Sequence, residues 1–313
     1  MSTDASVLPV IDVGALARAG HEGREDVARQ LDAACRDHGF FMVTGHGVDL
    51  GALARLEALA RAFFALPDPE KATIAMPLGG RAWRGWFPLG GELTSGVPDG
   101  KEGIYFGAEL PVEDRPMHGP NLFPERPEGL RDAVLAHLDA MAALGTLLVA
   151  GLDLGLGAGG RLSSLVGDPL PLFRIFHYPP GAASWGVAEH TDYGLLTILH
   201  QDEVGGLQVH RRDGWIDVPP VPGALVCNIG DMLEKATGGV YRSTPHRVRS
   251  PRDADRISMP YFFDPGWDTK VERLGDGPGA DPNRWDHADP HLFDGAYGDY
   301  VWSKVAKVFP DLA

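Results

Sequence analysis

Two histidines and one aspartate stand at a spacing that suits a metal ion. His190 and Asp192 are two residues apart in the part of the chain that is rich in predicted strands, and His246 follows much later in the chain. Side chains at i and i+2 of a strand project from the same face, about 6–7 Å apart along it. Both can therefore reach one ion through bonds of about 2.1 Å, and a histidine from a later strand can complete one triangular face. Two imidazoles and a carboxylate on one face leave the other positions open, which is the facial triad of non-haem Fe(II) oxygenases.

The His-x-Asp pattern occurs three times, and only the middle copy fits a metal site. Residues 137–139 read as helix, in which positions two apart point about 200° away from each other. Residues 287–289 lie near the end of the chain in a loop with proline and glycine. The copy at 190–192 is flanked by predicted strands and has a distant histidine to complete the set. We therefore predict that this copy and His246 bind the metal.

A carboxylate anchor is predicted ten residues after His246. Arg256 and Ser258 again stand two apart, so that both project from one strand face. An arginine binds a carboxylate through two parallel hydrogen bonds, and the serine adds a donor. The same Arg-x-Ser pattern occurs at 161–163, so by itself it also fits an exposed charge beside a serine. Downstream of the metal residues, it favours an anion site.

The first 160 residues are expected to be mainly helical and irregular. Apolar residues recur at helical spacing in three segments, and glycine or proline ends them. Two short apolar runs read as strands, the first at a sheet edge because it contains Pro9. The helices are expected at 24–38, 50–65 and 129–152, the strands at 7–13 and 40–44, and an irregular segment at 79–120.

The second half of the chain changes to short apolar strands separated by turns, with a strong hairpin signal at Asp213-Gly214. This spacing is typical of a double-sheet jelly roll. The strands are expected at 173–178, 194–200, 206–210, 215–218, 224–229, 246–249 and 256–263, followed by a helix at 297–309. We predict an α+β fold with a mainly β core. A double-stranded β-helix with a C-terminal helix spans 161–313, and the N-terminal region 1–160 packs on it as one compact unit.

Composition excludes several classes of function. The chain has 313 residues, 44% of them hydrophobic, and a formal net charge of −15. Such a charge disfavours partners with phosphate backbones and anionic membranes, so we expect no nucleic acid and no membrane partner. The longest apolar stretch, 144–160, is interrupted by Asp153, and residues 1–20 lack the features of a secretory signal. With only Cys35 and Cys227, a cytoplasmic protein with two buried thiols is expected.

Several short motifs occur in a fixed order along the chain. They lie at 8–12, 38–41, 45–48, 178–180, 190–192, 206–209, 228–231, 246–247 and 256–258. Together they span nearly the whole chain, and their order resembles the isopenicillin N synthase-like family of Fe(II)- and 2-oxoglutarate-dependent oxygenases. The resemblance implies iron bound by the three predicted ligands, and the distal carboxylate of 2-oxoglutarate (2OG) bound by Arg256, Ser258 and Tyr178. Phe176 departs from the family, because many plant members carry an asparagine there.

The resemblance also implies a reaction. 2OG would take two of the open metal positions and O2 the third. Succinate and CO2 would be released while a C–H bond of a small-molecule substrate is oxidised, most simply by hydroxylation. The oligomeric state is left open by the sequence.

The sequence indicates the residues of the substrate pocket less clearly than the metal and 2OG residues. Arginines alternate with aromatic residues in the segment that passes over the metal mouth in this family, which suits a ligand with a carboxylate and a flat or apolar body. The same rings fit a core between the helices and the sheets. Of the neighbouring Phe262 and Phe263, one is expected to face inward by alternation, and Phe263 is chosen. The predicted substrate contacts are Arg81, Trp83, Arg84, Tyr105, Phe106 and Phe263.

The sequence leaves two alternatives open. A family member that uses no 2OG, of the oxidative-cyclisation or ethylene-forming type, also carries Arg-x-Ser; against the former, residues 307–313 lack its glutamine. A non-catalytic jelly-roll binding module or a zinc hydrolase comes from other classes. A binding module needs no open metal face beside an anion anchor, and the nearest acid for a hydrolase, Glu189, alternates to the opposite strand face.

Overall fold

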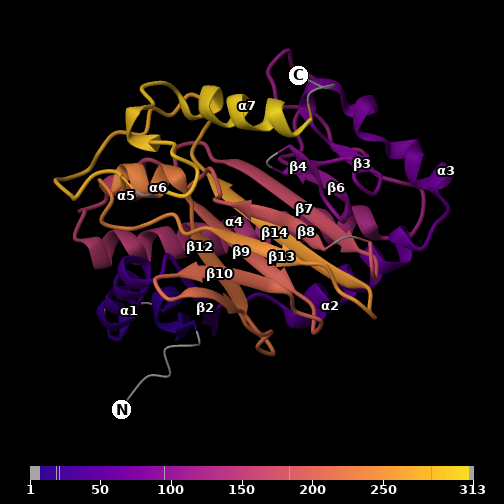
Figure 1. Ribbon diagram of the computed structural model, residues 1–313. Coiled ribbons are helices and arrows are strands. Elements are labelled where there is room, and N and C mark those ends of the chain that lie inside the picture. Colours follow the sequence, from indigo (N-terminus) through magenta and orange to yellow (C-terminus); the bar gives the residue numbers. More distant parts are fainter. Residues whose placement is uncertain are drawn as a thin grey trace.

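The computed structural model describes residues 8–18, 20, 22–94, 96–182, 184–282 and 284–309. Its centre consists of two facing β-sheets (Figure 1). The large sheet has the order β1-β2-β12-β9-β14-β7-β6-β3, and the small sheet has the order β11-β10-β13-β8. The large sheet contains β1 (Val10–Asp12), β2 (Phe40–Thr44), β3 (Gly85–Phe87), β6 (Glu102–Gly107), β7 (Leu170–Tyr178), β9 (Leu196–Gln201), β12 (Leu225–Ile229) and β14 (Arg256–Asp264). The small sheet contains β8 (Trp185–His190), β10 (Leu207–Arg211), β11 (Gly214–Asp217) and β13 (His246–Arg249).

The strands from β7 to β14 alternate between the two sheets along the chain, except that the consecutive strands β10 and β11 both lie in the small sheet. β7, β9, β12 and β14 belong to the large sheet, whereas β8, β10, β11 and β13 belong to the small one. This winding makes a double-sheet jelly roll, as predicted. The two inner faces enclose a space between them, and residues on successive strands can meet there from opposite walls.

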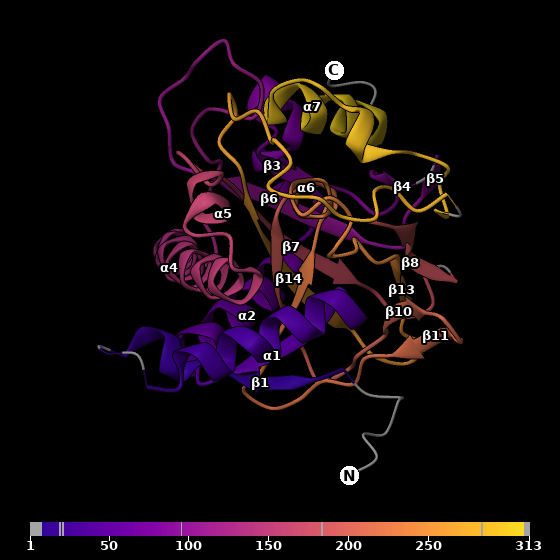
Figure 2. The same ribbon diagram turned by 90° about the vertical axis from the view of Figure 1, so that its left-hand side faces the viewer.

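Helices cover the outer face of the large sheet (Figure 2). They are α1 (Arg24–Asp37), α2 (Leu50–Phe64) and α4 (Leu130–Leu156), and α4 contacts β7, β9 and β14. By length and composition alone α4 could cross a membrane. Its apolar residues, among them Val134, Met141 and Leu148, are buried within the fold, which is how the core helix of a globular domain looks. The predicted C-terminal helix is α7 (Tyr297–Val308), at the opposite end of the molecule from α1 and α2.

The structure differs from the sequence analysis at several places. The segment 79–120, expected to be irregular, contains β3 and β6, which pair in series onto β7 and widen the large sheet. It also contains the small hairpin of β4 (Leu93–Thr94) and β5 (Val97–Pro98). Helix α4 ends at Leu156 rather than at 152. Strand β8 and the short helices α3 (Asp68–Lys71), α5 (Arg161–Ser164) and α6 (Asp231–Ala236) were not predicted.

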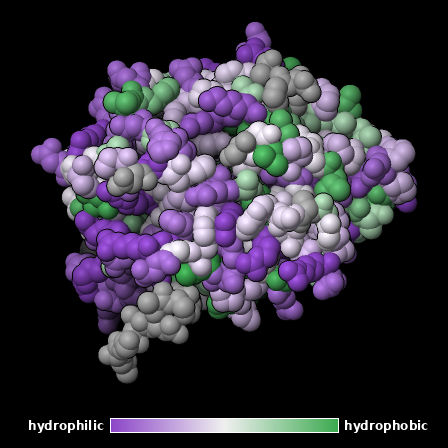
Figure 3. Space-filling view, in the orientation of Figure 1, coloured by the Kyte–Doolittle hydropathy of each residue, from purple (hydrophilic) through white to green (hydrophobic). Residues whose placement is uncertain are grey.

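The surface in Figure 3 is mostly hydrophilic, with hydrophobic residues in small separate groups. This agrees with the strongly acidic composition of the chain.

Candidate metal centre and active site

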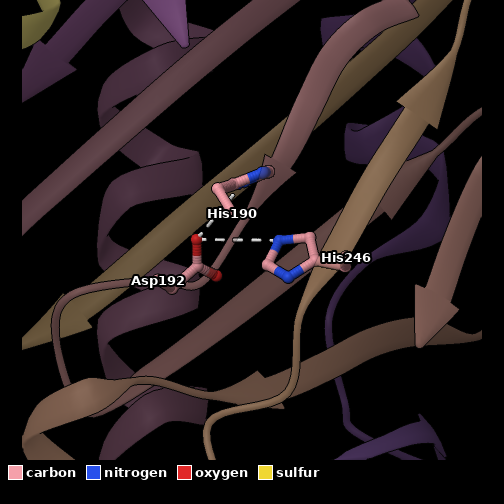
Figure 4. A group of neighbouring side chains, drawn as sticks. All are labelled: His190, Asp192 and His246. Atoms are coloured by element: carbon pink, nitrogen blue, oxygen red, sulfur yellow. Dashed lines mark ion pairs between the residues drawn. The ribbon is translucent and has the colours of Figure 1, made fainter. Parts of the chain in front are cut away.

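The three predicted ligands meet at one end of the small sheet. His190 ends β8, His246 begins β13, and the two are direct cross-strand partners. Asp192 follows β8 by two residues, so it is placed by the turn after the strand rather than by the strand face that the sequence suggested. Its Oδ1 lies 3.9 Å from Nε2 of His190 and 3.7 Å from Nε2 of His246. Figure 4 shows this one oxygen facing both imidazoles, and one ligand atom of each residue lies within 4.8 Å of the others.

Neighbouring backbone carbonyls orient both imidazoles. Nδ1 of His190 lies 2.9 Å from the carbonyl oxygen of Ala188. Nδ1 of His246 lies 3.3 Å from the carbonyl oxygen of Thr244. Because a carbonyl only accepts, each Nδ1 carries the proton, and each Nε2 keeps its lone pair for a metal.

The carboxylate of Asp192 is fixed in the same way. Its Oδ2 accepts a hydrogen bond of 2.7 Å from Nδ2 of Asn228 and another from the hydroxyl of Thr197. These two donors occupy one carboxylate oxygen and leave Oδ1 directed at the histidines. Supporting contacts of this kind hold the ligands of metal sites in place.

The protonation states also suit a metal. Burial lowers the pKa of both histidines, that of His246 to about 4, so both are neutral near pH 7. Burial by itself would raise the pKa of Asp192, but the two imidazoles and the hydrogen bonds from Asn228 and Thr197 lower it. Neutral imidazoles and an ionised carboxylate are the forms that bind a metal ion.

A buried guanidinium without a partner lies on β14. Arg256 is fully buried, and none of its three guanidinium nitrogens has a hydrogen-bond partner among the described residues. Tyr178, its cross-strand partner on β7, has its ring centroid 4.7 Å from the guanidinium carbon. An unpaired buried charge costs several kcal/mol, so this arginine fits a ligand that supplies a negative charge. The donor set suits the carboxylate of 2OG that the sequence analysis assigned to it.

A cavity of about 450 Å³ contains both the metal ligands and this guanidinium. The inner face of the large sheet forms one wall, to which every second residue contributes: 256–264 on β14 and 172–178 on β7. The small sheet contributes Val187, Leu207 and Val248 from the opposite side. Arg256, Ser258 and Tyr178 therefore share one end of a single cavity with apolar walls.

Of the six predicted substrate contacts, Trp83 and Tyr105 line this cavity. The two predicted arginines lie elsewhere, so their prediction as substrate contacts is wrong. Arg84 is buried and donates hydrogen bonds of 2.9 Å to the carbonyl oxygens of Ala82 and Met117. Arg81 forms an ion pair of 2.9 Å with Asp114, and both side chains are exposed.

The two predicted phenylalanines also face away from the cavity. Phe106 stacks on the rings of Phe123 and Phe173. Phe263 packs against α4, where a Cβ at Gly145 would come within 2.6 Å of its ring. The choice of Phe263 was wrong because it has the opposite parity to Arg256 along β14. Counting by twos from Arg256 leads to Phe262, which lines the cavity.

A group of charged side chains along the same cavity was not predicted from the sequence. Arg174 is four residues before Tyr178 and therefore lies on the same face of β7. This even spacing could have predicted that Arg174 faces the cavity. Glu92 and Lys101 also line the cavity and form an ion pair of 2.9 Å, and Asp99 forms a second ion pair with Lys101. These three come from the segment around the β4–β5 hairpin, in which no periodic pattern marks the inward positions.

The open positions of the metal site lie in the same cavity as Arg256, which suits the distal carboxylate of a co-substrate. A metal, a co-substrate and O2 can therefore come together in this cavity. The fold and the site thus define a non-haem Fe(II) oxygenase. Comparison with known families agrees with this class. Residues 8–126 match the N-terminal family of the non-haem dioxygenases in morphine synthesis, and residues 169–265 match the 2OG-Fe(II) oxygenase superfamily. The chain belongs to the 2OG-Fe(II) oxygenase superfamily and is a 2OG-dependent dioxygenase.

The chain is similar to known proteins over nearly its whole length. A probable iron/ascorbate oxidoreductase of Dictyostelium discoideum is 43% identical over 97% of this chain and 95% of that protein. A homoarginine-6-hydroxylase of Glycine max is 36% identical with both chains fully covered, and a 1-aminocyclopropane-1-carboxylate oxidase of Dictyostelium mucoroides is 33% identical over 99% of this chain and 97% of that protein. Among solved structures, a 2OG-Fe(II) oxygenase family protein from Caulobacter crescentus superposes with a TM-score of 0.80 at 26% identity, covering 97% of this chain and 100% of that chain.

Proposed function

We propose that this dioxygenase hydroxylates a C–H bond of a small polar molecule with O2, one oxygen atom entering the product and the other entering succinate as one 2OG is converted to succinate and CO2. The observation that carries the proposal is the buried, unpartnered guanidinium of Arg256 in the same cavity as His190, Asp192 and His246. Iron and 2OG, when bound, supply the oxidising chemistry.

The chain's own residues position the reactants and keep water away. Arg256, with Ser258 and the ring of Tyr178 beside it, holds the distal carboxylate of 2OG. Apolar side chains surround the carbon chain of the co-substrate, and they exclude water that would compete for the same hydrogen bonds. These walls are formed by Phe176, Val187, Leu199, Leu207 and Val248.

The names of the relatives indicate which compounds to try first. One relative is named for the hydroxylation of homoarginine and another for the oxidation of 1-aminocyclopropane-1-carboxylate. Both compounds are amino acids. Free amino acids, these two included, are therefore the first panel of candidate substrates.

The second candidate is an oxidase of the same family that consumes no 2OG. The 1-aminocyclopropane-1-carboxylate oxidases among the relatives favour it. In that case Arg256 would hold a carboxylate of another reactant, and product would form without succinate.

The test is a titration of the anaerobic Fe(II) protein with 2OG, followed by succinate release in air with the amino-acid panel. A metal-to-ligand charge-transfer band that saturates with 2OG, together with substrate-dependent succinate, supports the proposal. If the wild-type protein shows no band and releases no succinate with any compound, the proposal is wrong. Product formed from a panel member in the absence of 2OG would establish the oxidase instead.

A further inference from the structure

The cavity contains a second guanidinium, which the 2OG site does not use. Arg174 lies on β7 four residues before Tyr178 and lines the same cavity. At about 3.3 Å per residue, it is roughly 13 Å along the strand from the Arg256 end. Since the other carboxylate of 2OG is expected at the metal, the co-substrate does not occupy this second site. Arg174 is therefore available to a different ligand.

Two aromatic rings hold Arg174 in place and leave its polar edge free. Tyr105 is its cross-strand partner on β6, and the ring centroids of Tyr105 and Phe262 lie 4.3 and 4.7 Å from the guanidinium carbon. Nε of Arg174 is buried and has no hydrogen-bond partner among the described residues. Oε1 of Glu92 lies 3.7 Å from Nη1, which is beyond hydrogen-bond distance. A planar guanidinium held in this way suits a carboxylate.

Glu92 is an anion at the same place. Its Oε1 accepts a hydrogen bond of 2.6 Å from the hydroxyl of Tyr105, and its Oε2 pairs with Nζ of Lys101 at 2.9 Å. Burial alone would raise the pKa of Glu92, but Lys101 and Arg174 lower it, so the carboxylate is ionised near pH 7. Glu92 is 4% exposed and lines the cavity, where a cationic group of a ligand can reach it.

The charges of this cluster balance before any ligand binds. Glu92 and Asp99 are the two anions, and Lys101 and Arg174 are the two cations. A ligand with a single charge would leave one buried charge uncompensated, which is costly. A ligand that carries one negative and one positive group keeps the balance. It can also replace the long contact between Arg174 and Glu92 with two short ones.

We propose that the primary substrate is a zwitterionic amino acid, with its carboxylate bound by Arg174 and its ammonium group bound by Glu92. The inference rests on the proposed function, because it assumes that 2OG occupies the Arg256 end. Tyr105 and Phe262 position the guanidinium, and Lys101 positions Glu92. The rest of the cavity, which the metal ligands line, receives the carbon chain of the substrate.

The first test measures binding to the wild-type protein loaded with Mn(II) and 2OG, which does not turn over. Calorimetric titration with the panel of free amino acids should find at least one that binds. Its N-acetyl derivative, which lacks the ammonium charge, and its decarboxylated amine should each bind about 30-fold more weakly or worse. Equal binding of either derivative overturns the proposal, and so does a protein that binds 2OG but none of the free amino acids. A protein that fails to bind 2OG refutes the proposed function instead.

The second test compares two matched variants, Arg174→Gln and Arg256→Gln. Arg174→Gln should lose about 30-fold or more in affinity for the amino acid and keep the charge-transfer band with 2OG, which also shows that the site is folded. Arg256→Gln should lose affinity for 2OG. Glu92→Gln should weaken the binding of the amino acid and of its decarboxylated amine, which both carry the ammonium group, and should leave the binding of the N-acetyl derivative unchanged. Wild-type affinity for the amino acid in Arg174→Gln overturns the assignment.

Discussion

His190 and His246 are direct cross-strand partners on β8 and β13, and their ring centroids lie 4.2 Å apart. The pairing of two strands in the small sheet thus sets the distance between the two imidazoles. Phe40 from the large sheet packs edge-on against His246 at 5.2 Å and fixes that ring from the other wall. A slip of one residue between β8 and β13 would turn one imidazole to the opposite face, so the metal site depends on the register of these strands.

Replacing His190, Asp192 or His246 with alanine should abolish turnover while the fold survives, since each supplies one of only three protein ligands. Zn(II) should occupy the wild-type site without supporting turnover, because zinc has no redox chemistry. Metal analysis, circular dichroism and succinate release check both points. Turnover with Zn(II) under rigorous exclusion of iron would contradict the metal assignment.

Arg256→Ala should weaken 2OG binding by about 30-fold or more, because a charge-assisted contact of roughly 2–5 kcal/mol is lost in a buried site. Arg256→Lys should recover only part of the affinity, since an ammonium group lacks the planar fork. The charge-transfer titration measures both variants. Iron content should stay at the wild-type level, and its loss would show that Arg256 supports the metal site instead.

Asn228→Ala should lower the affinity for iron by roughly 10–100-fold, because Asn228 donates to the oxygen of Asp192 that faces away from the histidines. Asn121→Ala is the matched control. Asn121 is also buried and hydrogen-bonded, to Gly107 and Glu109, but it does not line the cavity. Equilibrium dialysis of iron against a chelator should separate the two variants, and equal affinities would count against the supporting role of Asn228.

Phe263→Ala should destabilise the protein by roughly 3–5 kcal/mol, because it leaves a cavity where the ring packs between β14 and Gly145 of α4. The folded fraction should keep its kcat/KM. Phe262→Ala should instead lower the affinity for the substrate, since this ring lies in the cavity against Arg174. Urea unfolding and steady-state kinetics distinguish the two neighbours. A raised KM in Phe263→Ala would restore it as a substrate contact.

The stability of the metal-free protein should depend on Asp264. Burial raises the pKa of Asp264 to about 7, from 3.8. Between about pH 4 and 7 the folded state therefore binds a proton that the unfolded state has lost, and the free energy of unfolding falls as the pH rises. Above pH 7, this decrease in the free energy of unfolding reaches roughly 4 kcal/mol. Asp264→Asn should remove this slope in urea unfolding at several pH values, and an unchanged slope would show that Asp264 ionises freely.

Much of the metal and co-substrate site could be predicted from the sequence. His190, Asp192 and His246 stand out because few residue types bind a metal, and the spacing of Arg256 and Ser258 reflects the period of a strand. The spacing of short strands after residue 160 likewise predicted the jelly roll. Each of these features is a residue type or a short spacing along the chain, so it can be recognised in the sequence alone.

Strand pairing decided what the sequence did not. Strand β8 escaped notice because Gly186 and Glu189 weaken its apolar pattern, although it carries a metal ligand. Phe262 rather than Phe263 faces the cavity. Alternation along β14 predicts this only once Arg256, six residues before Phe262, is known to point inward. Arg174 meets Tyr105 because β6 pairs with β7.

The substrate end of the cavity was the least predictable part. Glu92 and Arg174 lie far apart in the sequence and approach each other only in the folded chain. The alternation of side chains along one strand shows which of its residues share a face. Which strands become neighbours depends instead on the free energy of packing the whole fold. The sequence by itself therefore determined the metal chemistry, and only the tertiary structure determined which charges face the substrate.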